Sequence, residues 1–133
     1  MSVENVALIK GLYADFTSGN VPGVLGAMSP DIVWNEANNF PYADGNPYIG
    51  PEAVAEGVFM RCATEWDGFG VEMDAIHDAG DTVIALGHYV GTYKATGKTQ
   101  RTQAVHVWTI EGGRSVKFQQ YADTLHVAQV TAV

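Results

Sequence analysis

The chain contains little of what nucleic-acid-binding, membrane and disulfide-rich proteins depend on. Its 133 residues include one cysteine, Cys62, and 7 lysines and arginines against 15 aspartates and glutamates, a formal charge of −8. One cysteine forms no disulfide within the chain, and an acidic chain without a basic cluster attracts neither nucleic acid nor an anionic membrane. No apolar run is long enough for a transmembrane helix, and Glu4 interrupts the start of the chain, where a signal peptide is apolar. These absences predict a cytoplasmic protein that acts on a small molecule or on a protein partner.

Sequence motifs of common cofactor and metal sites are also missing. The chain has no glycine-rich phosphate loop, no Gly-x-Ser-x-Gly turn and no Cys-x-x-Cys pair. Its four histidines, His77, His88, His106 and His126, lack the close spacing of metal ligands. We therefore expect no metal and no cofactor.

The first part of the chain predicts helices in one domain, residues 1–133. Apolar residues make up 47% of the chain, which is enough for a buried core. Between Ile9 and Phe16 they recur at the spacing of one helical face. Pro22 falls in the first turn of a second, short helix that reaches Met28, and Pro51 begins a third helix.

The second part predicts strands. Short separators that contain glycine divide it, which is typical of hairpins in an antiparallel meander. Helices followed by strands indicate an α+β fold. The segment 38–50 is rich in proline, glycine and aromatic residues, so we expect a loop that covers a site. The expected strands are residues 31–36, 71–79, 82–93, 99–110 and 115–124.

The strand 82–93 has apolar residues on both faces. Val83, Ala85 and Tyr89 alternate with Ile84 and Leu86. An antiparallel strand with one solvated face should instead alternate with polar residues. Because no sequence remains to form a second layer, we expect a homodimer packed through the sheet.

Glu36 is the first candidate for chemistry. On a strand it shares a face with Trp34, so a core position for the indole carries the carboxylate inward. A carboxylate desolvated beside an indole has a raised pKa and acts as a general base or acid near neutral pH. The alternative is that the strand has already ended and Glu36 is solvated.

His106 and Asp123 are the other candidates. His106 shares a strand face with Ala104 and Trp108, where an imidazole either bonds a neighbouring carbonyl or donates to a substrate oxygen. Asp123 is either a structural acceptor or the acidic partner of His106. Gln120 has the opposite strand parity from Asp123, so only a bulge brings both to one cavity.

Five segments together resemble the SnoaL-like, ketosteroid isomerase-related branch of the nuclear transport factor 2-like (NTF2-like) superfamily. They are residues 31–36, 48–54, 91–98, 104–113 and 118–124. The resemblance spans nearly the whole chain. It implies a cone of three N-terminal helices packed on a curved, mostly antiparallel sheet that encloses a pocket. It also implies an enzyme or a binding protein, since this fold hosts both.

The resemblance places roles on particular residues. Glu36 falls where ketosteroid isomerases keep their carboxylate base, and His106 falls where they keep an acidic oxyanion donor. Their second donor, a helical tyrosine, corresponds to Leu12, with Tyr13 one position away. The Asp-Arg-Asp set of limonene-epoxide hydrolases is absent, whereas a cyclase role for Glu36 or Asp123 with His106 is compatible with the family.

The expected function is therefore a cofactor-independent isomerase or cyclase that acts on a small apolar carbonyl compound. Glu36 would transfer the proton, His106 would polarise the oxygen, and Asp123 would orient His106 or share the acid–base task. The alternative is a non-catalytic ligand-binding or dimerisation module. The expected substrate-binding residues are Tyr13, Phe16, Trp34, Tyr48, Phe59, Trp66, Trp108, Gln120 and Tyr121.

Overall fold

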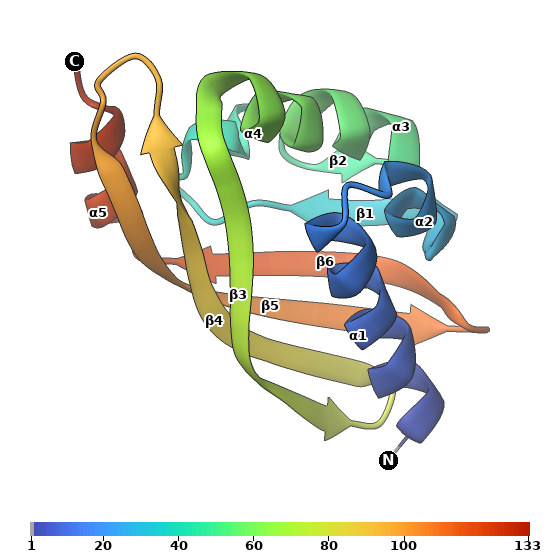
Figure 1. Ribbon diagram of the computed structural model, residues 1–133. Helices are drawn as coiled ribbons and strands as arrows, with labels where there is room; N and C mark the ends of the chain where they lie inside the picture. The colour runs from blue at the N-terminus through green and yellow to red at the C-terminus, as the bar shows by residue number, and fades with distance from the viewer. Residues whose placement is uncertain (1) are drawn as a thin grey trace.

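A six-stranded curved sheet is the frame of the computed structural model, which describes residues 2–133 (Figure 1). Its order is β2-β1-β6-β5-β4-β3. The antiparallel meander is confirmed for the last four strands, but β1 pairs with β6 in parallel. Turn signals could not predict that pairing, because its partners lie far apart in sequence. The strands are β1 (Met28–Asn35), β2 (Tyr48–Ile49), β3 (Trp66–Ala79), β4 (Thr82–Tyr93), β5 (Thr99–Glu111) and β6 (Arg114–Ala122).

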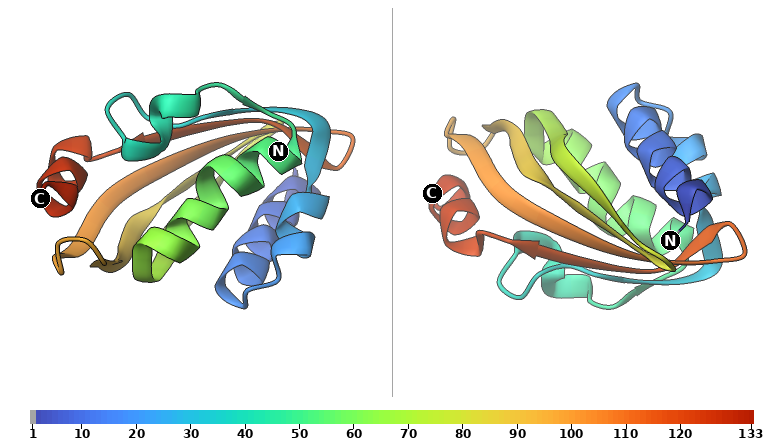
Figure 2. Two further views of the ribbon diagram at one scale, coloured as in Figure 1. Left: turned by 90° about the horizontal axis from the view of Figure 1, so that it is seen from above. Right: turned by 90° about the horizontal axis from the view of Figure 1, so that it is seen from below.

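Three helical segments cover the concave face of the sheet (Figures 1 and 2). The first two are α1 (Val3–Thr17) and α2 (Val21–Gly26). The third runs through α3 (Pro51–Val54), the π-helical turn η2 (Ala55–Phe59) and α4 (Met60–Glu65). The expected α+β cone with three N-terminal helices is therefore confirmed. Among residues 2–133, no helix is both long and apolar enough to cross a membrane.

Local signals explain where several elements begin and end. The side chain of Ser2 accepts from the backbone N–H of Asn5 and caps α1, and Asn20 caps α2 in the same way. The sequence pattern predicts that the second helix reaches Met28. That prediction is wrong, because α2 ends at Gly26 and Met28 belongs to β1.

The chain ends in a helix that the strand pattern did not predict. β6 stops at Ala122, and α5 (Thr124–Thr131) follows it. Asp123 is the N-cap of α5, since its carboxylate accepts from the backbone N–H of His126 at 3.2 Å. The expected strand 115–124 is therefore wrong in its last two residues.

The expected loop 38–50 contains two short elements. The 3₁₀ helix η1 (Pro41–Gly45) comes first, and β2 then pairs with β1. Arg61 of α4 holds this segment, since its guanidinium donates to both carboxylate oxygens of Asp44 at 2.8 and 3.0 Å and lies over the ring of Tyr42. The segment is therefore fixed against the third helix.

The core lies between the helices and the concave face of the sheet. Trp34, Trp108 and Phe118 pack together there: Trp34 and Phe118 are stacked with ring centroids 3.7 Å apart, and Trp108 is tilted against Phe118 with centroids 4.6 Å apart. Aromatic pairs of this kind contribute about 0.5–1.5 kcal/mol each beyond the area they bury. This cluster forms one wall of the pocket described next.

Candidate functional site

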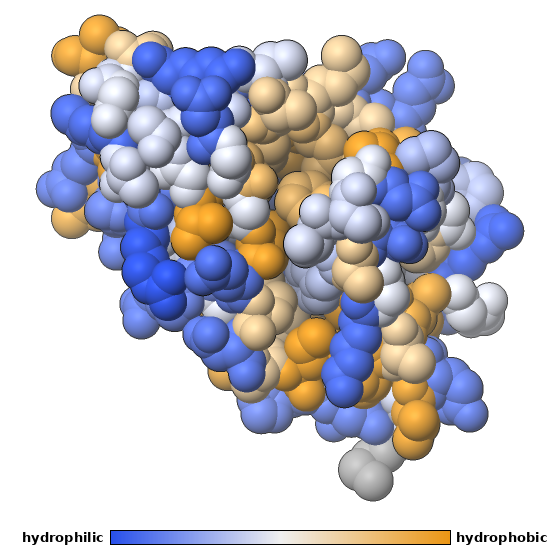
Figure 3. All heavy atoms as spheres, in the orientation of Figure 1, coloured by the Kyte–Doolittle hydropathy of each residue, from blue (hydrophilic) through white to orange (hydrophobic). Residues whose placement is uncertain are grey.

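A narrow pocket lies between α1, the third helix and the sheet. In Figure 3 the surface is hollowed between α1 and the α3–α4 segment, and apolar side chains border the hollow. The free space is about 40 Å³, which is room for a few water molecules. The lining residues are mainly aromatic: Leu12, Tyr13, Phe16, Trp34, Glu36, Phe40, Val58, Phe59, Cys62, Phe69, Val71, Tyr89, His106, Trp108, Phe118 and Gln120.

Glu36 is the carboxylate of this pocket. It is 2% exposed, so its inward placement is confirmed: β1 does end at Asn35, as the alternative held, but Glu36 is not solvated. Its Oε2 accepts from the indole N–H of Trp34 at 3.1 Å, while Oε1 is buried without a hydrogen-bond partner. The side chain of Asn46 bonds both the backbone N–H and the carbonyl of Glu36, each at 2.9 Å. The carboxylate is thus held with one oxygen free.

Burial decides the protonation of Glu36. Desolvation raises the pKa of its carboxyl to about 7, against the opposing effect of the Trp34 hydrogen bond and of the more distant Arg61 charge. Both the carboxylate and the acid are therefore populated near neutral pH. Such a group accepts a proton in one step and returns it in the next.

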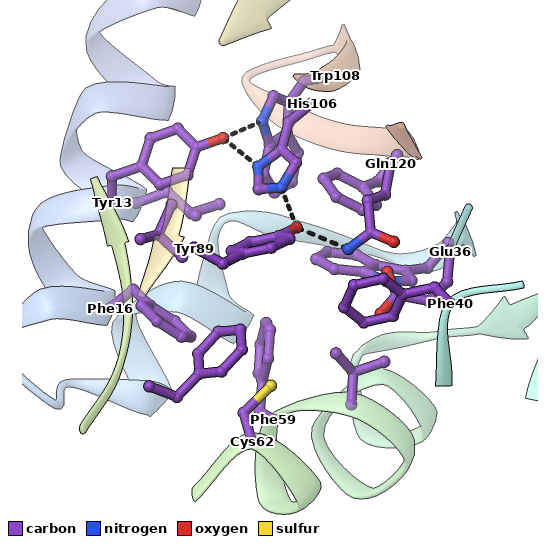
Figure 4. A pocket seen from close by; sticks show the side chains of 16 residues that line it. Tyr13, Phe16, Glu36, Phe40, Phe59, Cys62, Tyr89, His106, Trp108 and Gln120 are labelled. Carbon is purple, nitrogen blue, oxygen red and sulfur yellow. Dashed lines mark hydrogen bonds between the residues drawn. The ribbon is translucent and has the colours of Figure 1, made fainter. Parts of the chain in front are cut away.

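His106 lies in a chain of hydrogen bonds on the sheet side of the pocket (Figure 4). Its Nδ1 bonds the hydroxyl of Tyr13 at 2.6 Å, and its Nε2 bonds the hydroxyl of Tyr89. Trp108 donates to the Tyr13 oxygen at 2.9 Å, and Gln120 donates to the Tyr89 oxygen at 2.6 Å. Both ring nitrogens of His106 are thus occupied by protein groups.

The same burial keeps His106 neutral. Desolvation lowers the pKa of its imidazole to about 3, so the ring carries no charge at neutral pH. Burial also raises the pKa of Tyr13 and of Tyr89 above the ordinary value, so both hydroxyls keep their protons. The polar groups beside Glu36 are therefore uncharged donors and acceptors.

Several of the expected site residues meet in this pocket. Tyr13 is brought in by the phase of α1, which turns both Leu12 and Tyr13 toward the cavity. The others that meet there are Phe16, Trp34, Glu36, Phe59, His106, Trp108 and Gln120.

Asp123 and Tyr121 do not reach the pocket. Asp123 is exposed and caps α5, so it neither orients His106 nor shares the acid–base task in this structure. Tyr121 is 57% exposed on the opposite face of the sheet from Gln120. Strand parity is the physical reason, because no bulge lies between Gln120 and the end of β6 to reverse it.

Tyr48 and Trp66 are buried beside the pocket, where they support η1 in the segment 38–50, called the lid below because its Phe40 lines the pocket. The hydroxyl of Tyr48 donates to the carbonyl of Tyr42 at 2.6 Å, and the indole of Trp66 donates to the hydroxyl of Tyr42 at 3.0 Å. Both side chains thus hold the η1 segment and do not line the cavity. The expectation that both residues contact substrate is therefore corrected, because tertiary packing places them behind the pocket wall.

Tyr89 is the polar pocket residue that sequence reasoning missed. It has the strand parity of the buried Val83 and Ala85, which was the available signal. Its hydroxyl reaches His106 along the sheet because the pair between them, Gly87 and Ala104, is small. Phe40, Val58, Cys62, Phe69, Val71 and Phe118 also line the pocket without having been expected there.

The site offers no metal-ligand cluster. Within residues 2–133 there is no group of three or more His, Cys, Asp or Glu side chains placed to hold an ion. Cys62 lines the pocket, and burial raises the pKa of its thiol, so it is protonated.

Comparison with known proteins places this geometry in a family. A family model of the SnoaL-like domain matches residues 9–118. The chain belongs to the SnoaL-like domain family. An NTF2-like protein from Burkholderia thailandensis is 37% identical over 100% of both chains, with a TM-score of 0.93. No curated protein matches this SnoaL-like domain.

Two more distant structures share the fold. IdmH from Streptomyces antibioticus, a proposed polyketide cyclase, is 19% identical to this SnoaL-like domain, covering 99% of this chain and 100% of its own, with a TM-score of 0.79. A protein with a ketosteroid isomerase-like fold from Catenulispora acidiphila is 17% identical, covering 95% and 92%, with a TM-score of 0.78. The NTF2-like fold of the SnoaL-like domain is thereby established.

Proposed function

We propose that this SnoaL-like domain is a cofactor-independent isomerase or cyclase that uses Glu36 to move a proton on a small, apolar carbonyl compound. The observation that carries the proposal is the buried Glu36 carboxylate with one unbonded oxygen in an aromatic pocket. A buried acceptor without a partner is costly, so its retention points to a ligand that satisfies it. The names of the cyclase and isomerase-like neighbours agree with this chemistry.

The chemistry is a proton transfer next to a carbonyl. Ionised Glu36 takes a proton from the carbon beside the carbonyl, the electron pair of that C–H bond forms a C=C bond, and the π pair of the carbonyl moves onto its oxygen to give an enolate. A hydrogen-bond donor from the Tyr13–His106–Tyr89 side stabilises the developing charge. Protonated Glu36 then returns the proton at another carbon. In a cyclase, the enolate carbon instead attacks a second carbonyl carbon of the same substrate, the π pair of that carbonyl moves onto its oxygen, and this oxygen takes the proton from Glu36.

The test is hydrogen–deuterium exchange at carbon. Cyclohexanone and 2-tetralone are incubated in D₂O near pH 7, and α-deuteration is followed by NMR. We expect the protein to accelerate exchange and Glu36→Gln to lower the rate at least about 100-fold, the scale of general base catalysis. The matched control is Glu72→Gln, a carboxylate exposed on β3 that pairs with Arg101.

Two outcomes contradict the proposal. One is no exchange above the buffer rate with either ketone, and the other is equal exchange by the wild type and Glu36→Gln. Either result favours the second candidate, a non-catalytic ligand-binding module. The observation that favours this second candidate is the small free space between the aromatic side chains.

A further inference from the structure

The hydrogen-bond chain around His106 ends in a donor on each side (Figure 4). The indole nitrogen of Trp108 is only a donor, and it points at the Tyr13 oxygen. The amide of Gln120 is oriented by the backbone N–H of Ala37, which donates to Oε1 at 3.0 Å. The NH₂ group of Gln120 therefore faces Tyr89. Each tyrosine oxygen thus accepts one hydrogen bond from an end of the chain.

The middle of the chain has one donor and one acceptor. A neutral imidazole carries a proton on one nitrogen and a lone pair on the other. Because burial holds the pKa of His106 far below neutral, this is its form at physiological pH. One tyrosine hydroxyl therefore donates to His106, and the other accepts from it.

One tyrosine hydroxyl proton of the chain has no acceptor. The tyrosine that accepts from His106 already accepts from Trp108 or Gln120, so its own hydroxyl proton has no acceptor within the chain. Among residues 2–133, neither tyrosine hydroxyl has a further partner. A buried donor without an acceptor is as costly as a buried acceptor without a donor. Both tyrosines are lining residues of the cavity.

We infer that the pocket offers its ligand one hydroxyl proton, which the tautomer of His106 places on Tyr13 or on Tyr89. The ligand is then an apolar ring compound with one acceptor oxygen, and because the free space is about 40 Å³ its entry requires the aromatic side chains to move apart. His106 is a positioning residue that does not touch that oxygen. With a proton on Nδ1 the free hydroxyl belongs to Tyr13, and with a proton on Nε2 it belongs to Tyr89.

This inference deepens the proposed function and rests on it for the substrate class, but its test needs no turnover. The probes are 1-indanone and indane, which have the same ring frame and differ by a ketone oxygen. Binding is measured from the fluorescence of the pocket tryptophans. The tautomer of His106 is measured by ¹⁵N NMR on histidine-labelled protein, with signals assigned by comparison with His106→Asn.

The expected result has two parts. First, wild-type protein and Glu36→Gln both bind 1-indanone at least about tenfold more tightly than indane. Second, 1-indanone shifts the two ¹⁵N resonances of His106 in opposite directions, which shows a change of tautomer without protonation of the ring. In the bound state, Tyr89→Phe holds the Nδ1–H tautomer and Tyr13→Phe holds the Nε2–H tautomer. Tyr121→Phe, on the outer face, behaves as the wild type.

Four results overturn the inference. They are equal affinity for the two probes, no binding of either, His106 resonances unchanged at saturation with 1-indanone, and loss of the whole preference in one single tyrosine variant. The wild-type measurements decide even if a variant fails to fold. If the protein prefers 1-indanone to indane but catalyses no proton exchange, only the proposed function is contradicted. If it catalyses exchange but shows no such preference, only this inference is contradicted.

Discussion

Glu36 is held by neighbours that act on different parts of the residue. The indole of Trp34 bonds one carboxylate oxygen, while the side chain of Asn46 bonds the backbone N–H and carbonyl. Because β1 ends at Asn35, Asn46 supplies the two bonds that a neighbouring strand would otherwise make. The backbone is thus fixed just where the ladder stops, and the second carboxylate oxygen is left to the pocket.

The raised pKa of Glu36 predicts how stability depends on pH. Its folded pKa of about 7 lies above the ordinary value of 4.5, so the folded state binds the proton more tightly than the unfolded state. This contribution is fully present below pH 4.5 and is lost as pH rises through 7. The difference of about 2.5 pKa units corresponds to an upper estimate of about 3 kcal/mol.

The measurement is the free energy of unfolding from urea titrations between pH 4.5 and 8. Relative to the wild type, Glu36→Gln gains stability with rising pH across this range, because the amide never ionises. A difference between the two proteins that stays constant from pH 4.5 to 8 would show that Glu36 ionises in the fold as easily as in water.

At the scale of elements, the π-helical turn η2 makes room for the lid. Gly57 lies in this turn, and a Cβ there would lie 2.1 Å from Cε1 of the Tyr48 ring. Tyr48 cannot retreat easily, since its hydroxyl donates to the carbonyl of Tyr42. The same turn carries Val58 and Phe59, which line the pocket. The packing of the lid is therefore coupled to the packing of the pocket wall through Gly57.

Gly57→Ala is expected to destabilise the fold by about 1–3 kcal/mol, the usual cost of overpacking a core. Thermal unfolding followed by circular dichroism measures it. Gly11→Ala is the matched control, because Gly11 is exposed on α1 with no atom within 4 Å of an added Cβ. That control should stabilise by about 0.5–1 kcal/mol. Equal stability of Gly57→Ala and the wild type would mean that Tyr48 moves freely.

Prediction from sequence worked best within single elements. The alternation that starts in β1 and continues one residue past its end at Asn35 places Glu36 with Trp34, and that of β5 places His106 with Trp108, because side-chain direction on a strand has a period of two. The same alternation separates Gln120 from Asp123. Of the two alternatives for Asp123, the structural acceptor is confirmed, because its carboxylate caps α5, whereas the helix that it caps was not predicted.

At the scale of the whole molecule, the outer face of the sheet carries exposed apolar side chains among polar ones such as His88 and Gln103. Leu86 is 36% exposed and Tyr121 is 57% exposed, while Ile84 and Val90 beside them are half-buried. The helices cover only the concave face (Figure 2). We propose that a second copy of the chain covers this face, since apolar side chains lie on both faces of β4.

Leu86→Glu is expected to prevent this association, because each copy would bury an unpaired charge in the interface. Analytical ultracentrifugation at micromolar concentration should give a dimer for the wild type and a monomer for Leu86→Glu. Met60→Glu, a substitution at an exposed apolar residue of α4 on the helical side, should remain dimeric. A monomeric wild type at this concentration would refute the homodimer.

The sequence by itself determined the order of most elements and the faces of the strands, because these follow from periodicities of a few residues, and it made Glu36 a candidate whose burial only the structure decided. Only the tertiary structure decided that Tyr89 reaches His106 over Gly87 and Ala104 and that α1 turns Tyr13 toward the same imidazole. It also decided that β1 pairs with β6 in parallel. The physical reason is that each of these contacts joins segments far apart in the chain, and their relative position depends on how the whole core packs.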